Sequence, residues 1–405
     1  MALSIFYIGY VIGEVPSNMM LRKFGPRKWI PIVIFLWGTI MMAMAAVKSA
    51  AGLYASRFFL GLAEAGYAPA PVFVISLWYI RSEQAIRIGL FFSAATVAGA
   101  FGGLLAYAIT RMEGILGLTG WQWIFIIEGF LTIIASVVAY FRLPDLPSKA
   151  TFLTPDEKQL ALQRLEFDSG HVQDTTFSRK QFYSAFVDWR VYFFMAIGLL
   201  HHVSFAALGL FIPSIVRGFG YDAVTTQIMT VPIYAIACLF TLTAAFSADR
   251  NKERGLHIVA ASFFSAIGYL ILILTRHSLT AARYTGLVIC TSGMYAFIPC
   301  FLSWPAANIA GATKRGVAIA LVISISHIGS ITGGQLYRSD DAPLYKRGHI
   351  VSASTMVLVG LLALILRSIL KRENKRRERL SPQEYMVECD KVDQAEDHPG
   401  FRFYT

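Results

Sequence analysis

Long apolar stretches separated by short polar connections make up most of this chain. Eleven of them are long enough to cross a bilayer, which takes roughly 20 residues of helix. Five precede and six follow a polar gap at residues 142–190. The pattern predicts helical spans at 2–21, 29–47, 52–78, 88–110, 122–141, 191–216, 225–248, 257–275, 282–304, 315–335 and 350–370.

The composition supports a polytopic membrane protein. Aliphatic, aromatic and sulfur side chains account for 56% of the 405 residues and charged ones for 15%. A soluble domain of this length could not bury so much apolar surface, so we expect an all-α polytopic fold in the lipid bilayer. No catalytic triad, P-loop, metal-ligand cluster or cofactor motif is present in the sequence, which argues against an enzyme and predicts no cofactor and no metal.

The net charge of +11 follows the expected topology. Basic residues are more frequent in the short loops of one side, eleven against eight, and the tail beyond residue 370 adds six more. The positive-inside rule then places the C-terminus and the 142–190 loop in the cytoplasm. The charge is therefore no indication of nucleic-acid binding.

An internal repeat relates the two groups of spans. Similar segments recur 226 to 231 residues apart: 55–58 with 281–284, the basic loop at Arg22 with that at Asp249-Arg250, and Gly102-Gly103 with Gly333-Gly334. Such duplication is typical of transporters built from repeated bundles. With this offset, the sixth span has no counterpart in the first half, so we expect two six-helix bundles with 11 of 12 helices present.

The repeat gives an expected domain organisation. It consists of a first bundle at 1–141 that lacks its first helix, an inter-bundle loop at 142–190, a second bundle at 191–370 and a tail at 371–405. Thr154 and Glu157 form a capping-box pattern that predicts a short helix within the loop. The charged tail is expected to be disordered.

Arg57 and Glu64 form the strongest candidate site. Seven residues are almost two helical turns, so the two side chains share one face of the third span. Glu64 lies about 18 Å along this helix, near the middle of the hydrocarbon core. Such a carboxylate could exchange a proton, and Arg57 could bind an anionic substrate. The alternative is a structural pair that holds helices together.

Other polar residues are weaker candidates. Glu14, near the end of the first span, could pair with loop arginines as a conformational latch, or it could be a solvated carboxylate. Trp304 and Asn308 could line a cavity, although a proline kink explains this region equally well. The adjacent His201 and His202 point about 100° apart and cannot chelate together, so we expect buried or cavity-lining histidines.

Several short motifs together resemble a known family. They are Glu14 to Asn18 with Leu21 to Lys28, Arg57 to Gly61 with Glu64-Ala65-Gly66, Phe91 to Gly103, Trp123-Ile124-Phe125, Ser303-Trp304 with Asn308, Thr313-Lys314-Arg315, Asp341-Ala342-Pro343 and Phe401-Arg402-Phe403. The combination resembles the major facilitator superfamily and, within it, the fungal anion:cation symporter branch of allantoate permease-like proteins.

This resemblance implies proton-coupled uptake of a small organic anion by alternating access. It implies substrate binding by Arg57, with Asn308 and Trp304 as further candidates, and proton coupling by Glu64. It also implies a gating role for the loop residues, which are Glu14, Arg22, Gly25, Arg27, Asp249 and Arg250. A monomer in the plasma membrane is expected. In relatives, a first helix with an Asp-Arg pair precedes the segment that this chain matches.

A second hypothesis keeps the fold without the transport. A truncated, non-transporting paralogue or a membrane nutrient sensor would share the same spans. The expected lack of the first helix is the feature that favours it. Uptake measurements distinguish the two hypotheses.

Overall fold

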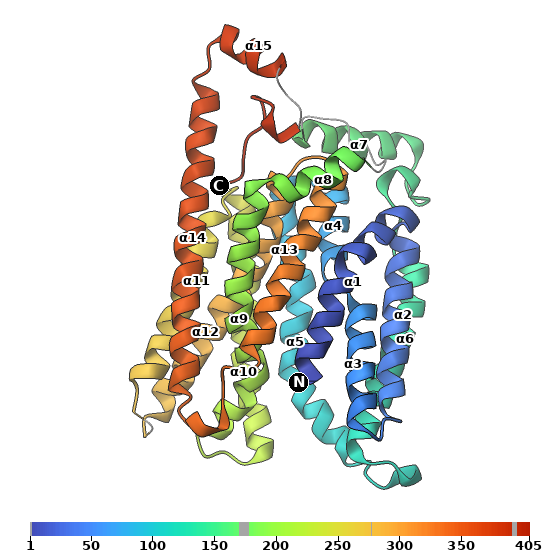
Figure 1. Ribbon diagram of the computed structural model, residues 1–405, viewed down its shortest axis with the longest axis vertical. Helices are drawn as coiled ribbons and strands as arrows, with labels where there is room; N and C mark the ends of the chain where they lie inside the picture. Colours follow the sequence, from blue (N-terminus) through green and yellow to red (C-terminus); the bar gives the residue numbers. More distant parts are fainter. Residues whose placement is uncertain (1, 170–177, 277, 391–394) are drawn as a thin grey trace.

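The computed structural model describes residues 2–169, 178–276, 278–390 and 395–405, and the regular elements of this part are all helical (Figure 1). The long helices are α1 (Ala2–Phe24), α2 (Pro26–Met44), α3 (Ala50–Glu64), α4 (Pro69–Trp78), α5 (Gln84–Thr110), α6 (Gly120–Arg142), α9 (Trp189–Arg217), α10 (Ala223–Arg250), α11 (Gly255–Leu274), α12 (Thr280–Asn308), α13 (Ala312–Gly333) and α14 (Lys346–Glu378). Shorter helices are α7 (Pro155–Ser169), α8 (Arg179–Val187) and α15 (Pro382–Asp390). Residues 170–177 of the expected loop and 391–394 of the expected tail lie outside the described residues.

Ten segments of the described chain are long and apolar enough to cross a membrane. They match ten of the eleven expected spans. The remaining one, α1, is a helix of 23 residues but is less apolar. Its second half carries Glu14, Ser17 and Asn18, which are all buried against other helices.

The third expected span is broken, where the sequence analysis predicted one continuous helix. α3 ends at Glu64, and α4 starts at Pro69 after a turn. Gly66 in this turn has φ +84°, a conformation that favours glycine. A Cβ atom at Gly66 would also lie 2.3 Å from the Ser17 hydroxyl, so the turn is pressed closely against α1.

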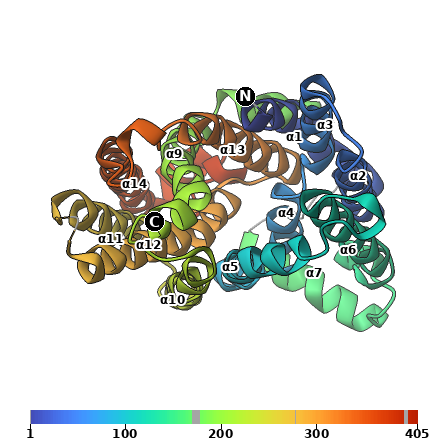
Figure 2. The same cartoon turned by 90° about the horizontal axis from the view of Figure 1, so that it is seen from below.

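The spans form two groups that meet along two helix pairs. Figure 2 shows α1 to α6 on one side and α9 to α14 on the other. In the first group α3 packs on α1 and α2, and α2 on α6; in the second, α9 packs on α13 and α14, and α12 on α10 and α11. The groups meet where α5 packs on α10 and α1 on α13.

The contact between α5 and α10 depends on glycines. A Cβ atom at Gly99 would lie 2.7 Å from the Tyr234 ring, and one at Gly103 would lie 1.8 Å from Oε1 of Gln227. Gly99 and Gly103 therefore permit the close approach of α5 and α10.

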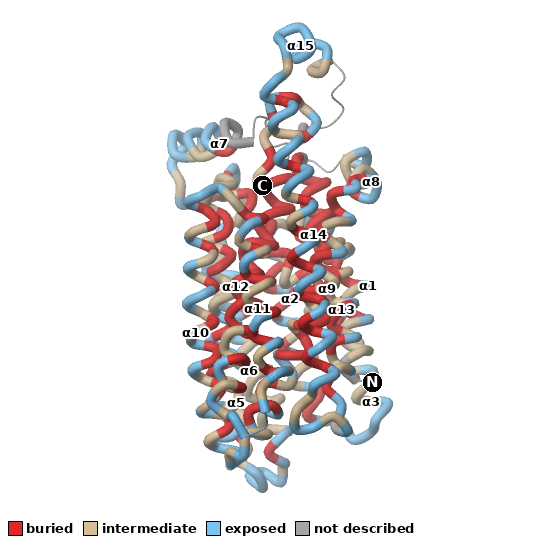
Figure 3. Tube along the Cα trace, turned by 90° about the vertical axis from the view of Figure 1, so that its left-hand side faces the viewer, coloured by how far each residue is buried: buried red, intermediate tan, exposed pale blue. Residues whose placement is uncertain are grey.

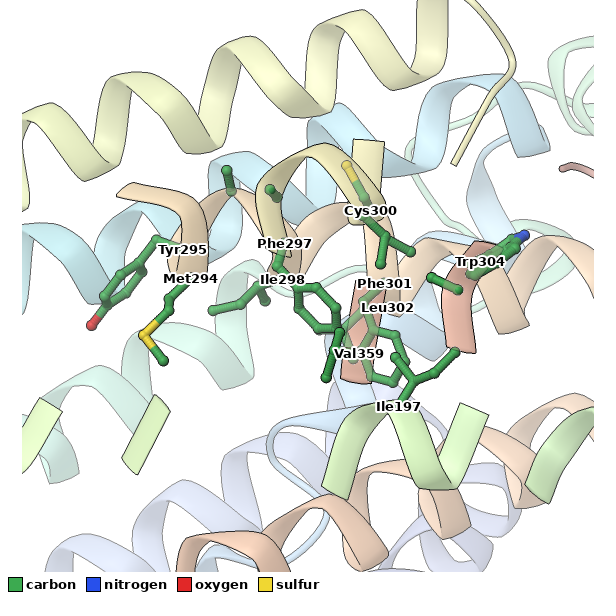
Figure 4. Close-up of a cluster of buried hydrophobic side chains, with 14 of the residues drawn as sticks. Ile197, Met294, Tyr295, Phe297, Ile298, Cys300, Phe301, Leu302, Trp304 and Val359 are labelled. Atoms are coloured by element: carbon green, nitrogen blue, oxygen red, sulfur yellow. The ribbon is translucent and has the colours of Figure 1, made fainter. Parts of the chain in front are cut away.

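Burial follows the pattern expected in lipid. Buried positions lie inside the helical body and exposed ones on its outside (Figure 3). The outer face of α6 exposes large apolar side chains, which are Phe130, Leu131, Ile134, Val137 and Val138. The densest core surrounds α12, where Phe297, Phe301 and Trp304 pack in a row (Figure 4). We therefore place the helical body in the hydrocarbon region.

One end of the bundle carries α7, α8 and the last residues of the chain, and we call it the tail-side face (Figure 1). The capping box of α7 is confirmed, because the Thr154 N–H donates to the Glu157 carboxylate (2.8 Å) and the Glu157 N–H to the Thr154 hydroxyl (3.3 Å). The hydrogen bonds from Thr154 lower the pKa of Glu157.

The expectation of a disordered tail is wrong for the described residues. α14 continues to Glu378, and residues 395–405 return to the tail-side face. Phe401 and Phe403 are buried there, and the Arg377 guanidinium donates to three main-chain carbonyls of this segment. Burial of aromatic rings together with charge-assisted hydrogen bonds outweighs the charged composition of the tail.

Candidate functional site

Arg57 and Glu64 lie on α3, and Glu64 is its last residue. The break therefore leaves the carboxylate at a helix end, partly exposed. The two charges interact electrostatically, but they do not belong to the ion pairs closer than 4 Å in the described chain. The Arg57 Nε atom has no hydrogen-bond partner among the described residues. Both groups are thus available to a ligand, and they are not locked to each other.

Three tyrosines lie within electrostatic range of Glu64. Tyr7 and Tyr10 of α1 and Tyr67 of the α3–α4 turn are each close enough to interact electrostatically with its carboxylate. Phenolic hydroxyls can donate hydrogen bonds to a carboxylate or to a substrate. Glu64 is therefore near groups that can donate hydrogen bonds.

A cavity with about 130 Å³ of space lies between the α3–α4 turn and the second bundle. Its walls come from both groups of helices. They consist of Ala68, Phe92, His201, His202, Phe205, Phe297, Ile298, Phe301, Leu302, Ile323, Ser326 and His327. The prediction that the adjacent histidines are buried or line a cavity is confirmed for both. His327 was missed, because it is 125 residues away from His202 and no local pattern connects them.

Asp249 joins the two groups of helices at the tail-side face. Its carboxylate accepts hydrogen bonds from the N–H groups of Ala85 (3.2 Å) and Ile86 (2.7 Å), at the N-terminus of α5. Its other partner is Arg254, whose Nη1 lies 2.7 Å from Oδ1. A carboxylate at a helix N-terminus is stabilised by the helix dipole and by the free N–H groups. This contact, which we call the Asp249 latch, holds α10 to α5.

Three further hydrogen bonds cross between the groups near α1, α4 and α13. Asn18 Nδ2 donates to the Gly316 carbonyl (2.8 Å), and Ser324 Oγ to the Val11 carbonyl (3.2 Å). The Arg315 guanidinium donates to the Ser76 carbonyl at 3.4 Å. The bonds of Asn18 and Arg315, together with the Asp249 latch, join the two groups near the tail-side end.

The other predicted gating residues differ in their burial and in their contacts. Gly25 joins α1 to α2 with φ +84°, and a Cβ atom there would lie 2.8 Å from Asp145. The Arg22 guanidinium lies over the Phe73 ring, 5.7 Å from its centroid. Arg27 and Arg250 are exposed. The expectation that Glu14 pairs with loop arginines is wrong in this conformation: it is fully buried, and its carboxylate has no partner in the described chain.

Trp304 and Asn308 contact the tail segment, not the cavity. The Trp304 Nε1 and the Asn308 Nδ2 both donate to the Tyr404 carbonyl, at 2.8 and 2.9 Å. In return, the Tyr404 N–H donates to Asn308 Oδ1 (2.8 Å). A paired hydrogen bond of this kind imitates a backbone pair and fixes the segment in register. Whether these residues also bind substrate stays a prediction.

The Asn308→Ala variant is expected to release the tail segment. It removes both hydrogen bonds to Tyr404, each worth about 0.5–1.5 kcal/mol net. Trypsin should then cut after Arg402 severalfold faster than in the unchanged protein. Asn251→Ala, an exposed position of the same face, is the control. Equal cleavage of the two variants would show that Asn308 does not anchor the segment.

A buried charge cluster lies next to this segment and was not predicted. Lys314 pairs with Asp188 (2.8 Å) and Glu396, and Arg190 pairs with the same two carboxylates at 2.8 and 3.3 Å. All four side chains are at least nine-tenths buried. Removing one member of such a cluster costs about 3–5 kcal/mol, because a charge is left buried and unpaired. Asp188 and Arg190 are neighbours in sequence, but the other paired residues are more than 80 residues apart, so no sequence spacing indicates the cluster.

Comparisons with known proteins agree with this geometry. Residues 1–334 match the Major Facilitator Superfamily family model. The chain is 37% identical to the MFS transporter prlL of Fungal sp. (strain NRRL 50135) over 90% of its own length and 74% of that protein. It is 34% identical to the MFS-type transporter cnsO of Penicillium expansum, over 100% and 81% of the two lengths.

A solved structure shows the same fold. The proton:xylose symporter XylE superposes with a TM-score of 0.69 at 14% identity, covering 92% of this chain and 85% of XylE. The expected fold class is therefore confirmed. On the family match, the relatives and the shared fold, this chain belongs to the major facilitator superfamily, a family of membrane transporters and not of enzymes.

Proposed function

We propose that this protein couples the uptake of a small organic anion to the entry of protons by alternating access. The observation that carries the proposal is the arrangement at α3, where a carboxylate and an arginine share one helix face without forming an ion pair. Arg57 would bind the anionic group of the substrate, and Glu64 would take up and release the proton. The likeness to XylE supports the fold alone, so proton coupling rests on Glu64.

The direction of coupling follows from the charges. An unprotonated Glu64 repels an incoming carboxylate, whereas a protonated one leaves the positive charge of Arg57 uncompensated and open to the anion. Binding of the proton and of the anion would thus favour each other. A symporter needs this cooperation, because each ligand must bind better in the presence of the other.

Alternating access would use the two groups of helices as moving bodies. We assign residues 1–141 and 191–370 to them, with 142–190 as the connecting loop. The Asp249 latch and the bonds near α13 would close the tail-side gate, and the loop residues Arg22, Gly25, Arg27 and Arg250 would take part. The basic tail-side loops favour a cytoplasmic position for this face. We further propose a monomer in the plasma membrane.

The proposal is tested by uptake into proteoliposomes. A panel of radiolabelled carboxylates and their neutral amides is offered with the outside at pH 5.5 or 7.5 and the inside at pH 7.5. We expect uptake of at least one carboxylate, faster from the acidic side, and no uptake of its amide. Equal uptake of both would contradict an anion carrier. Binding of a carboxylate without any uptake would favour a membrane sensor or a non-transporting paralogue.

The Arg57→Ala variant is expected to raise the KM for the transported carboxylate about tenfold or more. It removes a hydrogen bond between charged groups, worth about 1.5–3 kcal/mol. Arg111→Ala is the matched control, since Arg111 follows the last residue of α5 and is exposed. A KM that changes no more than in this control would remove Arg57 from the binding site.

A further inference from the structure

Three imidazoles meet at the cavity between the bundles. His201 and His202 come from α9 and His327 from α13. The ring centroids of His202 and His327 are 5.4 Å apart, and those of His201 and His202 are 5.5 Å apart. The described chain holds no group of three side chains suited to bind a metal ion, so these rings are not arranged around one.

His327 has hydrogen-bonding capacity that the protein does not use. Neither of its ring nitrogens has a partner among the described residues, and both are buried. The other two histidines are partly satisfied, because His201 Nε2 faces the Met294 carbonyl (3.2 Å) and His202 Nδ1 faces the Gly198 carbonyl (3.1 Å). A buried polar group without a partner costs about 1–3 kcal/mol. His327 is thus suited to bind a group that enters the cavity.

His327 also faces the first bundle. The Tyr7 ring stacks on it at 5.6 Å between centroids, and the Tyr10 ring contacts it edge-on at 4.3 Å. These are two of the tyrosines within electrostatic range of Glu64. His327 therefore belongs to the same polar region as Glu64, although it comes from the opposite bundle. A ligand between the bundles could contact both.

Four of the nine other residues that line the cavity are phenylalanines. The Phe297 ring lies parallel to His201, with 3.9 Å between centroids, and continues into Phe301 at 4.9 Å. Phe205 also stacks on His201, with 5.5 Å between centroids. Aromatic faces favour a flat, unsaturated partner, with which they stack in offset or edge-to-face geometry. A puckered ring of equal size has no such face.

We propose that His327 hydrogen-bonds the transported anion from the second bundle and that the ring-lined cavity selects carboxylates with a flat aromatic body. This inference rests on the proposed function and adds the substrate class. Arg57 and His327 then contact the substrate from the two bundles, so that binding depends on how the bundles are placed. His202 and Ser326 are the other polar residues of this wall besides His201.

The test compares benzoate with cyclohexanecarboxylate, which has the same ring size and charge but a puckered body. Binding is measured on the purified, reconstituted full chain by equilibrium dialysis of each labelled acid. We expect benzoate to bind at least about tenfold more tightly, a difference of about 1.4 kcal/mol. His327→Gln should lose most of this preference and weaken benzoate binding about tenfold. His257→Gln is the control, because His257 is bonded to Ser247 at the tail-side end and does not line the cavity.

The outcomes separate this inference from the proposed function. Equal binding of the two acids, no binding of either, or an unchanged His327→Gln variant would overturn the inference. If a carboxylate is still taken up with protons in that case, the proposed function stands alone. If benzoate binds through His327 but no anion is transported, the proposed function fails and the binding site stands. Thermal unfolding of each variant shows whether a loss of binding reflects a loss of fold.

Discussion

Glu64→Gln is expected to abolish accumulation driven by a pH gradient and to leave exchange of the substrate intact. Glutamine keeps the shape of the side chain but cannot exchange a proton. With one proton per monovalent anion, a gradient of one pH unit supports about tenfold accumulation, because each unit corresponds to about 1.4 kcal/mol. The variant should reach only the outside concentration. Counterflow of labelled against unlabelled substrate needs no net proton movement and should persist.

The control for this prediction is Glu128→Gln. Glu128 is a second partly exposed carboxylate within a span, on α6, and Arg57 interacts electrostatically with Glu64 and not with Glu128. The Glu128→Gln variant should accumulate substrate like the unchanged protein. If Glu64→Gln still accumulates substrate in response to a pH gradient, the proton is carried by another group. If it loses counterflow as well, Glu64 acts in substrate binding or folding.

Asp249→Asn is expected to open the tail-side gate. Asparagine presents an NH₂ group to one of the two N–H donors at the start of α5, and it leaves the fully buried Arg254 without a counter-ion. Hydrogen bonds to a charged group contribute about 1.5–3 kcal/mol, so the closed conformation should lose about ten- to a hundredfold in population relative to the open one. Uptake should slow, because the gate no longer closes in each cycle.

A native cysteine can report this change. Cys300 is fully buried on α12, close enough to Asp249 and Arg254 to interact with them electrostatically. In a variant that keeps only this cysteine, N-ethylmaleimide should label Cys300 at least about tenfold faster when Asp249→Asn is added. Asp222→Asn, at the N-cap of α10 on the opposite face, should not change the rate. Equal labelling with and without Asp249→Asn would contradict the latch.

The spans could be predicted because they depend on composition. A helix that crosses lipid needs only a sufficient length of apolar side chains, and ten of the expected segments have it. Local signals were also reliable where two residues act together in one turn. The capping box of Thr154 and Glu157 is the example.

The break after Glu64 was missed, although the sequence holds a signal for it. Pro69 starts α4 at the first helical position, and Gly66 precedes it in a conformation that favours glycine. Hydropathy does not register such a break, because the segment stays apolar on both sides. The break matters for the site, since it ends α3 at Glu64.

Contacts between distant parts of the chain could not be predicted from local sequence patterns. Tyr404 bonds to Asn308 across 96 residues, and Glu396 pairs with Lys314 across 82. In the same way, His202 and His327 approach only because α9 packs on α13. The charged composition of the tail is typical of a disordered segment. Its order became evident only from the surface against which Phe401 and Phe403 are buried.

Proton movement itself is the most direct measurement of proton coupling through Glu64. Proteoliposomes are loaded with a pH-sensitive dye, and a transported carboxylate is added outside at equal pH on both sides. Protein-free vesicles correct for acid that crosses the lipid unaided. We expect the lumen to acidify with the unchanged protein and not with Glu64→Gln, while both perform counterflow. Uptake by the unchanged protein without acidification, or equal acidification by Glu64→Gln, would contradict this expectation.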